Sequence, residues 1–375
     1  MPLYLTDEQA MLRDTARDFV ADAAPVKHMR RLRDANDATG FSRDLWKQFA
    51  DMGFTGILMG EADGGLGLGH VEAGIVLEEI GRNLSPSPFL ATAVAAVEAL
   101  KGSAHAARYF PGILAGETVA ALAIDERAKH GTGIAMRAER SGNGFRLSGA
   151  KQFVTHGHVA DIIIVAARTA GSADDREGIT LFAVDRSAAG LTATPERLAD
   201  ASIAARLSFD GVELDADAVI GNVDAGADPL GRLLRAGRAG AAAELLGVGG
   251  GAMDMTVNYL KERKQFGLRI GSFQALQHRA AHLYSEMEVA RAAVLKAQQL
   301  LDTGDADAEQ AVSVAKAMTS LATTLAVQEG VQMHGGIGMT DEYDIGFYMK
   351  RGRVLAEMFG DANFHADQLA QAAGY

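Results

Sequence analysis

The feature that most constrains the fold is the order in which two kinds of hydrophobic pattern follow one another along the chain. Apolar residues recur at helical spacing in the regions 1–118 and 229–375. The region 119–228 instead holds short apolar or alternating runs separated by glycine-containing turns, which is typical of strands. Because strands and helices are segregated along the chain, the order argues against a Rossmann fold and predicts an α+β protein.

These three regions are the expected domains: a helical domain over 1–118, a β domain over 119–228 and a second helical domain over 229–375. The first helix is predicted to begin after Thr6, since Gln9 stands three residues later and the two can form a capping box. Ser42 is predicted to precede another helix, with Leu45 and Phe49 on one face. Only 7 prolines occur in the chain, which favours long helices.

Composition excludes several classes of protein. With 48% hydrophobic and 22% charged residues, the chain has enough apolar material for a large core and is not disordered. The formal net charge of −12 makes a nucleic-acid partner unfavourable. The absence of cysteine excludes disulfides and thiolate chemistry, and the 10 histidines lack ligand spacing, so no metal site is predicted. No secretory signal or membrane-spanning run is visible, which predicts a cytoplasmic protein.

The stretch 259–274 is the most informative motif, YLKERKQFG followed by IGSFQ. The guanidinium of Arg263 could hold a pyrophosphate through paired hydrogen bonds, and it is expected at the end of an amphipathic helix interrupted by Gly267. Phe266 offers an aromatic face, and Gln274 offers both a donor and an acceptor. The plainer interpretation is a solvated helix face with Glu262 and Lys264 beside the arginine.

A second motif, QMHGGIG over 332–338, follows a long helical pattern. Paired glycines allow a backbone to approach a ligand closely, or they end a helix in the left-handed conformation. The residues alone leave both interpretations open.

Taken together, these motifs resemble those of the acyl-CoA dehydrogenase family of flavoproteins. Further segments resemble the family in the same order: LTDEQ at 5–9, GGLG at 64–67, LSFDGVEL at 207–214 and VIG at 219–221. The stretch 334–343 resembles the branch that includes subunits of heteromeric enzymes of bacterial sterol side-chain breakdown. The resemblance implies an N-terminal helical domain, a middle β-barrel-like domain and a C-terminal four-helix bundle.

The resemblance also implies FAD as the cofactor, with its adenylate half held by a neighbouring subunit. Arg263 is implied to contact the pyrophosphate, and Arg238 to lie at the substrate. Thr155 matches the hydroxyl beside the hydride-accepting nitrogen of the flavin, and Phe153 matches an aromatic residue that covers the flavin. The remaining implied cofactor residues are Gln265, Phe266 and Gln274 along the adenosine, with Gln332, Gly335 and Gly336 opposite.

The family reaction is α,β-dehydrogenation of an acyl-CoA, in which a carboxylate removes the α-proton while the β-hydrogen leaves as hydride. Both positions at which the family places this base are occupied by other residues here. Aligning Gly360 with the family glycine puts Phe359 in one base position, and the alternative position is Gly237. Glu244, Glu357 and Asp361 are the candidates for a displaced base. Each also has a structural interpretation: Glu244 as a buried partner for an arginine, Glu357 as a solvated helix charge, and Asp361 as a turn or cap residue.

The region 123–130 also departs from the family, because it lacks the proline and the glycine–serine–aspartate loop that contact flavin and substrate. Three functions therefore stay open. The first is an active acyl-CoA dehydrogenase that passes electrons to an electron-transfer flavoprotein. The second is a non-catalytic subunit that completes an FAD site for a related chain. The third is a flavin oxidase or monooxygenase. A homotetramer or heterotetramer is implied by the resemblance.

Overall fold

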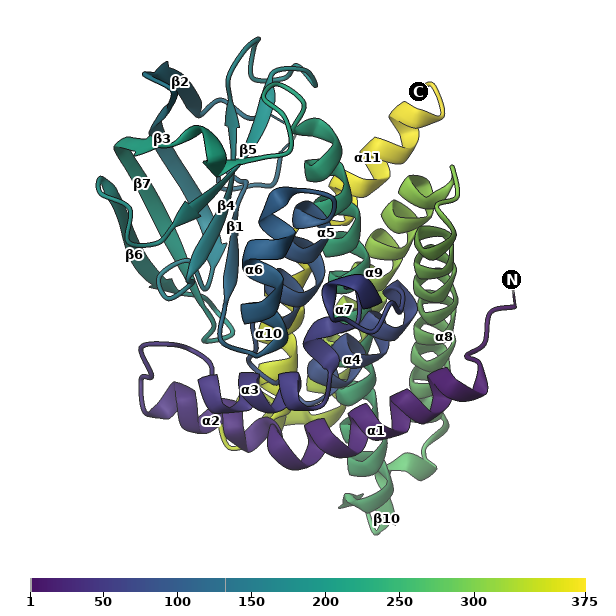
Figure 1. Cartoon of the computed structure of the whole chain (residues 1–375). Helices are drawn as coiled ribbons and strands as arrows, with labels where there is room; N and C mark the ends of the chain where they lie inside the picture. Colours follow the sequence, from purple (N-terminus) through teal and green to yellow (C-terminus); the bar gives the residue numbers. More distant parts are fainter. Residues whose placement is uncertain (1, 132) are drawn as a thin grey trace. The chain divides into compact units, whose positions relative to one another are not determined.

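The computed structural model describes residues 2–131 and 133–375, which form two compact units. Among the described residues, the first unit contains 2–31, 70–85 and 238–375, and the second contains 32–69, 86–131 and 133–237. Figure 1 shows the helices and the sheet of the chain. Among the described residues, no helix combines the length and the apolar character needed to cross a bilayer.

The first unit is built from helices. Its bounds are α1 (Asp7–Ala23), α4 (His70–Arg82), the part of α7 (Ala227–Glu262) from residue 238, α8 (Gln274–Thr303), α9 (Ala308–His334), α10 (Ile345–Glu357) and α11 (Ala362–Ala372), with a short hairpin of β9 (Lys264–Gln265) and β10 (Leu268–Arg269). Helix α9 packs against α8, α10 and α11. Leu245 and Val248 of α7, Val327 of α9 and Leu355 of α10 share one buried core.

The predicted helix starts are confirmed. The Thr6 side chain accepts from the backbone N–H of Gln9, the Gln9 side chain accepts from the backbone N–H of Thr6, and the two form the capping box of α1. In the second unit, the Ser42 hydroxyl accepts from the N–H of Leu45 and caps α3. Leu45 and Phe49 are buried on one face of that helix, as their spacing predicts.

The second unit combines helices with a mixed sheet. Its elements include α3 (Arg43–Asp51), α5 (Val97–Leu100), α6 (Ala104–Leu114), β1 (Ala120–Ala123), β2 (Arg137–Ser141), β3 (Gly144–Thr155), β4 (Ile162–Arg168), β5 (Ile179–Asp185), β6 (Leu191–Arg197), β7 (Ile203–Leu214) and β8 (Val219–Ile220), while α2 (Val26–Asp34) crosses between the units. The strands are ordered β6-β7-β3-β2-β4-β5-β8, and β1 pairs in parallel with β4. β4 is buried along its whole length, in agreement with its unbroken apolar sequence.

One irregularity in this sheet bears on function. The pairing of β3 with β7 shifts register between Lys151 and Val154. Within this bulge, Phe153 adopts a left-handed backbone conformation with φ of 53°. Bulges redirect side chains, and here the Phe153 side chain is exposed between the half-buried Gln152 and the buried Val154.

Candidate functional site

The predicted site residues fall in both units. Phe153 and Thr155 lie at the end of β3, in the unit that contains the sheet. The Phe153 side chain is 46% exposed, and Thr155 is half-buried. A large aromatic residue with that much exposure at a sheet bulge can cover the face of a flat ligand.

A buried ion pair supports this end of β3, and sequence reasoning did not predict it. Lys151 is completely buried, and its ammonium group donates to a carboxylate oxygen of Glu126 at 2.8 Å and to the carbonyl of Ile124 at 3.0 Å. Burial lowers the pKa of Lys151, and the Glu126 carboxylate opposes this shift. Glu126 also accepts from the backbone N–H groups of Ala135 and Met136.

Glu126 therefore ties the segment after β1 to β3. The loop 123–130, which departs from the family sequence, is therefore held in place by the carboxylate of its own Glu126. The signal available in the sequence was a single acidic residue after a strand, which is too common a pattern to identify a partner.

The motif around Arg263 forms a hairpin, where a continuous helix face was the plainer expectation. Helix α7 ends at Glu262, and the backbone N–H of Arg263 donates to the carbonyl of Tyr259 at 2.8 Å. Phe266 (φ of 53°) and Gly267 (φ of 76°) form the turn between β9 and β10. Two consecutive residues with positive φ are typical of a tight hairpin turn, which explains the glycine.

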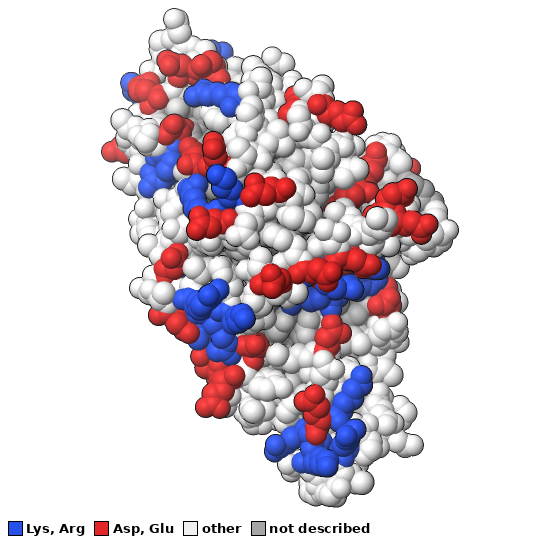
Figure 2. All heavy atoms as spheres, turned by 60° about the horizontal axis from the view of Figure 1, so that its bottom comes forward, with Lys and Arg blue, Asp and Glu red and all other residues white. Residues whose placement is uncertain are grey.

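This hairpin is exposed throughout. All residues from 261 to 269 are exposed, and the Phe266 side chain is 91% exposed. Four of these residues are cationic: Lys261, Arg263, Lys264 and Arg269. Figure 2 shows the resulting cluster of basic side chains at the lower end of the view, on a molecule whose net charge is −12. An exposed aromatic ring among cations is suited to a ligand that carries both an aromatic base and phosphates.

The remaining predicted cofactor residues lie near this hairpin. Gln274 begins α8, and Gln332 lies in the last turn of α9, both with exposed side chains. A small core connects the ends of these elements to α7, since Leu260, Ile270 and Met333 pack together. The structure thus brings together the hairpin, the start of α8 and the end of α9.

The paired glycines end α9. Gly335 has a φ of 66° and caps the helix, as one of the two interpretations of the motif predicted. A β-carbon at Gly335 or at Gly336 would meet nothing within 4 Å, so this backbone is also open to a ligand. The preceding His334 is buried between Tyr259 and Tyr343, and burial lowers its pKa.

The candidate bases each contact a structural partner. The carboxylate of Glu244 is 4% exposed, and one of its oxygens accepts from Nη2 of Arg351 at 2.5 Å and from Nε at 3.1 Å. Asp361 caps α11 by accepting from the backbone N–H of Phe364 at 2.9 Å. Glu357, in the last turn of α10, pairs with Arg353 at 3.0 Å.

Arg238 lies beside the turn that connects α10 to α11. Its side chain is buried, Nη1 donates to Glu309 at 3.0 Å, and Nε donates to the carbonyl of Phe359 at 3.3 Å. Its guanidinium also lies over the ring of Phe364. The residue implied to lie at the substrate is thus in direct contact with the residue that occupies the family's base position.

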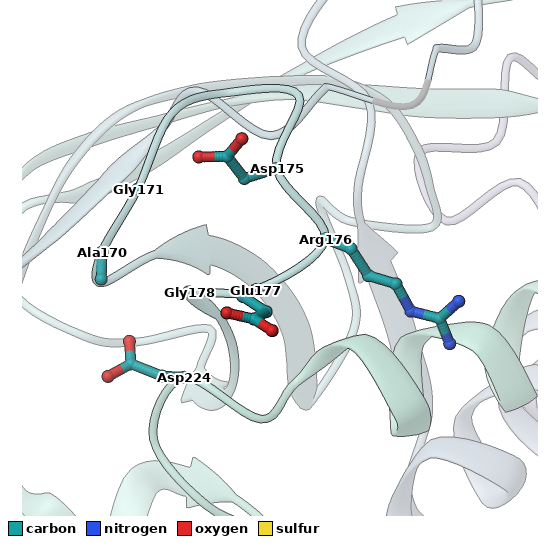
Figure 3. Close-up of a pocket in the computed structure, with 7 residues that line it drawn as sticks. All are labelled: Ala170, Gly171, Asp175, Arg176, Glu177, Gly178 and Asp224. Atoms are coloured by element: carbon teal, nitrogen blue, oxygen red, sulfur yellow. The ribbon is translucent and has the colours of Figure 1, made fainter.

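A separate pocket lies in the sheet-containing unit (Figure 3). It is lined by Ala170, Gly171, Asp175, Arg176, Glu177, Gly178 and Asp224, and none of the predicted site residues is among them. Arg176 extends away from Asp224 in Figure 3 and lies 3.7 Å from Asp228. Within residues 2–131 and 133–375, no group of three or more His, Asp or Glu side chains is arranged to hold a metal ion.

Relatives of known name cover nearly the whole chain. Cyclohex-1-ene-1-carbonyl-CoA dehydrogenase of Geobacter metallireducens is 30% identical over 372 residues, covering 96% of this chain and 96% of that protein. The mitochondrial short/branched chain specific acyl-CoA dehydrogenase of Bos taurus is 28% identical, covering 98% of this chain and 85% of that protein. A variant of the Tcur3481-Tcur3483 steroid ACAD has a solved structure that is similar to this one, with a TM-score of 0.88, 30% identity, and coverage of 98% of this chain and 99% of that chain.

The family models agree with these relatives. The N-terminal, middle and C-terminal domain models of acyl-CoA dehydrogenases match residues 6–117, 126–212 and 224–374, respectively. On this evidence the chain belongs to the acyl-CoA dehydrogenase family.

Proposed function

We propose that the chain binds FAD and catalyses the α,β-dehydrogenation of an acyl-CoA thioester. The observation that carries this proposal is the exposed hairpin, where Arg263 and Phe266 stand free of the chain's own core while lying beside Gln274 and the end of α9. A cationic and aromatic surface of this kind suits an adenine nucleotide.

A second observation supports FAD as the ligand of the described residues. The backbone at Gly335 and Gly336 is open, because a β-carbon at either position would meet no atom within 4 Å. Phe153 and Thr155 provide an exposed ring and a hydroxyl in the other unit. Arg263, Gln265, Phe266 and Gln274 would hold the nucleotide portion, with Gln332 and the two glycines opposite.

The chemistry that FAD supplies when bound is acceptance of a hydride from the β-carbon of the acyl group. The chain's own residues have to orient the acyl group and remove its α-proton. Phe153 would exclude water from the flavin face, and Thr155 would donate a hydrogen bond there. Glu357 at the end of α10 and Asp361 at the start of α11 flank the connecting turn, and one of these carboxylates would accept the α-proton.

Of the base candidates, Asp361 is the one that we favour. Its cap contact is a hydrogen bond from a neutral backbone N–H, whereas Glu244 accepts two hydrogen bonds from a guanidinium. A proton acceptor has to turn toward the substrate, and the ion pair with Arg351 holds the Glu244 carboxylate in place.

A second function rests on the same observations. Phe359 occupies the family's base position, and each carboxylate nearby has a structural contact, so a non-catalytic chain that shares an FAD site with a related subunit is the alternative. Under the first proposal, the partners are an acyl-CoA, an electron-transfer flavoprotein and further copies of this chain in a cytoplasmic tetramer. Under the second, the tetramer contains an unlike chain.

Anaerobic flavin reduction tests the proposal. The purified FAD-loaded protein is mixed with acyl-CoAs that carry short branched, cyclohexenyl or sterol side-chain acyl groups. Loss of the flavin's visible absorbance is expected with at least one of them. A fully loaded protein whose flavin none of these thioesters reduces would count against the dehydrogenase. Rapid reaction of the reduced flavin with oxygen would indicate an oxidase or monooxygenase.

Arg263→Ala tests the cofactor assignment separately. Removing a charged hydrogen-bond donor should weaken FAD binding by roughly ten- to a hundredfold. Lys261→Ala is the comparison variant: Lys261 is another exposed cation of the same stretch, so a smaller loss there shows that the effect of Arg263→Ala exceeds that of removing one positive charge. FAD retention equal to that of the unaltered protein in Arg263→Ala would contradict the assignment of the pyrophosphate contact.

A further inference from the structure

The turn between α10 and α11 is held by two buried cations on different helices. Lys316 of α9 is completely buried, and its ammonium group donates to the carbonyl of Ala356 at 3.0 Å and to the carbonyl of Gly360 at 2.9 Å. The Arg238 guanidinium donates to the intervening carbonyl of Phe359. Three carbonyls within five residues thus accept hydrogen bonds from side chains that lie far away in the sequence.

The backbone of this turn is strained, so it needs such support. Phe359 has a φ of 58° and Gly360 a φ of 107°. A β-carbon at Gly360 would lie 2.4 Å from the ring of Phe364 and 3.1 Å from Nε2 of His365. A non-glycine residue with positive φ persists only where its surroundings fix it.

We propose that Lys316 is a positioning residue, which fixes the turn that carries Phe359 and Asp361 and thereby sets the place of the group that removes the substrate proton. This inference rests on the proposed function. The hydrogen bonds that Lys316 donates to this turn go to backbone carbonyls, so they fix the geometry of the turn. An ammonium group supplies three donors, and carbonyls at Ala356 and Gly360 with the Ser320 hydroxyl at 3.4 Å account for three.

The charge state of Lys316 is sensitive to its surroundings. The charged groups that interact with it are Arg238 from α7, Glu357 from α10 and Asp361 at the start of α11. His365 of α11 lies beside Gly360, whose carbonyl accepts from Lys316. The net effect of these surroundings lowers the pKa of Lys316 to about 7: burial is the main cause, Asp361 opposes it, Arg238 adds to it and Glu357 opposes it. A neutral amine keeps two N–H donors, one for each carbonyl, and opening of the turn to solvent becomes less favourable as the pH rises above that value.

Hydrogen exchange tests the positioning without any need for turnover. Lys316→Met keeps the apolar stem of the side chain and removes the donors. Amides of the peptide 356–361 should exchange faster in this variant than in the unaltered holoenzyme, while amides of α8 should not change. Ser320→Ala is the matched control, because it removes the longest of the three contacts and leaves both carbonyl bonds. Unchanged exchange at 356–361 in Lys316→Met, or equal acceleration in both variants, would overturn the proposal.

The kinetics of flavin reduction by an acyl-CoA that the unaltered enzyme oxidises provide the second measurement. In Lys316→Met, the rate constant for flavin reduction should fall by roughly a hundredfold, since small misplacements of reacting groups have effects of that order. The KM should change less. The change in the unaltered enzyme's rate that accompanies deprotonation of Lys316 near pH 7 should be absent from the variant, a signature that a merely structural lysine would not produce. A variant with the same rate and the same pH profile as the unaltered enzyme would contradict the inference.

The outcomes separate this inference from the proposed function. If no acyl-CoA reduces the flavin, the proposed function fails, and the exchange experiment still decides whether Lys316 fixes the turn. If Lys316→Met does not fold, exchange of the unaltered protein at about pH 6 and about pH 9, corrected for intrinsic rates, replaces it. Higher protection of 356–361 at the higher pH supports the inference, because opening exposes Lys316 to solvent, where it binds a proton more readily; equal protection contradicts it.

Discussion

At the scale of single residues, the contacts of Glu244 and Asp361 give each of these candidate bases a structural role. The sequence placed Glu244 in a segment rich in alanine and glycine, where an unpaired charge would be poorly solvated. The structure gives it a partner, Arg351, from a helix about 100 residues away. Asp361 lies at the start of a helix and caps it. A carboxylate in such a contact has a structural role whether or not it also takes part in catalysis.

We expect Glu244→Gln to destabilise the protein without abolishing flavin reduction. The amide cannot balance the charge of Arg351, and breaking a buried ion pair costs about 3 kcal/mol. Thermal unfolding monitored by circular dichroism, together with anaerobic flavin reduction, measures both effects. Full loss of reduction at unaltered thermal stability would instead identify Glu244 as the base.

Asp361→Asn provides the complementary test. Asparagine caps helices about as well as aspartate, so the free energy of unfolding should change by less than about 1 kcal/mol. If Asp361 is the base, the rate of flavin reduction should fall by several orders of magnitude, in keeping with the loss of an essential proton acceptor. A rate close to that of the unaltered enzyme would exclude Asp361 from this role.

The pKa of Lys316 predicts a pH dependence of stability. The pKa is about 7 in the folded protein and ordinarily 10.5, so between these values the unfolded chain holds the additional proton. The free energy of unfolding therefore rises with pH in this window, with a slope of up to about 1.4 kcal/mol per pH unit from this group. Below about pH 7 the group is charged in both states and contributes no slope.

Lys316→Met should lack this contribution. The difference in free energy of unfolding between the unaltered protein and the variant should change with pH between 7 and 10.5 and stay constant at lower pH. Urea titrations across that window measure it. A constant difference at every pH would mean that Lys316 keeps an ordinary pKa in the folded state.

At the scale of elements, the crossing of α4 and α7 depends on glycine. A β-carbon at Gly81 would lie 2.0 Å from the carbonyl oxygen of Glu244, and one at Gly247 would lie 1.9 Å from the carbonyl oxygen of Glu78. The two helix backbones are therefore in direct contact. The sequence shows many glycines in α7, which alone would argue against a long helix.

Gly247→Ala should consequently be strongly destabilising, by about 3 kcal/mol or more, because backbone rather than a movable side chain stands in the way. Gly346→Ala in α10 is the matched control. Its β-carbon would lie 3.9 Å from the nearest neighbour, the carbonyl oxygen of Gly338. There alanine should raise stability by up to about 1 kcal/mol through its helix propensity. Similar melting temperatures for the two variants would contradict the close helix contact.

At the scale of the whole molecule, the basic hairpin is the surface that stands out. Nine consecutive exposed residues, from 261 to 269, carry four cations and the 91% exposed Phe266 on a chain of net charge −12. An apolar ring with that exposure is more stable when covered by a ligand or a neighbouring chain. This surface is where we expect assembly and cofactor binding to depend on one another.

Native mass spectrometry of the chain expressed alone measures the size of the assembly and its FAD content together. A tetramer with one FAD per chain is the expected result for a self-sufficient enzyme. Phe266→Ala should lower FAD content and, through the shared ligand, the fraction of tetramer. An assembly with little FAD that becomes loaded upon co-expression with a related chain would support the alternative of a heteromeric enzyme.

The sequence by itself determined the order of helices and strands, the helix starts at Thr6 and Ser42, and the family. These follow from local patterns: periodicity, capping chemistry and motifs in register. The hairpin at Phe266 and Gly267 was within reach of the sequence, since a glycine after an aromatic residue permits a turn. It was interpreted as an interruption of a helix because the preceding pattern is helical.

Only the tertiary structure decided which charged residues have partners. The decisive contacts join residues about 40 or more positions apart: Lys316 with the carbonyls of Ala356 and Gly360, Arg238 with Phe359, and Glu244 with Arg351. No local pattern encodes them, because a buried charge is stabilised by whatever group the fold brings within hydrogen-bonding distance. The fold could therefore be read from short-range patterns, whereas the chemistry of the turn at Phe359 depends on the packing of helices that are distant in the sequence.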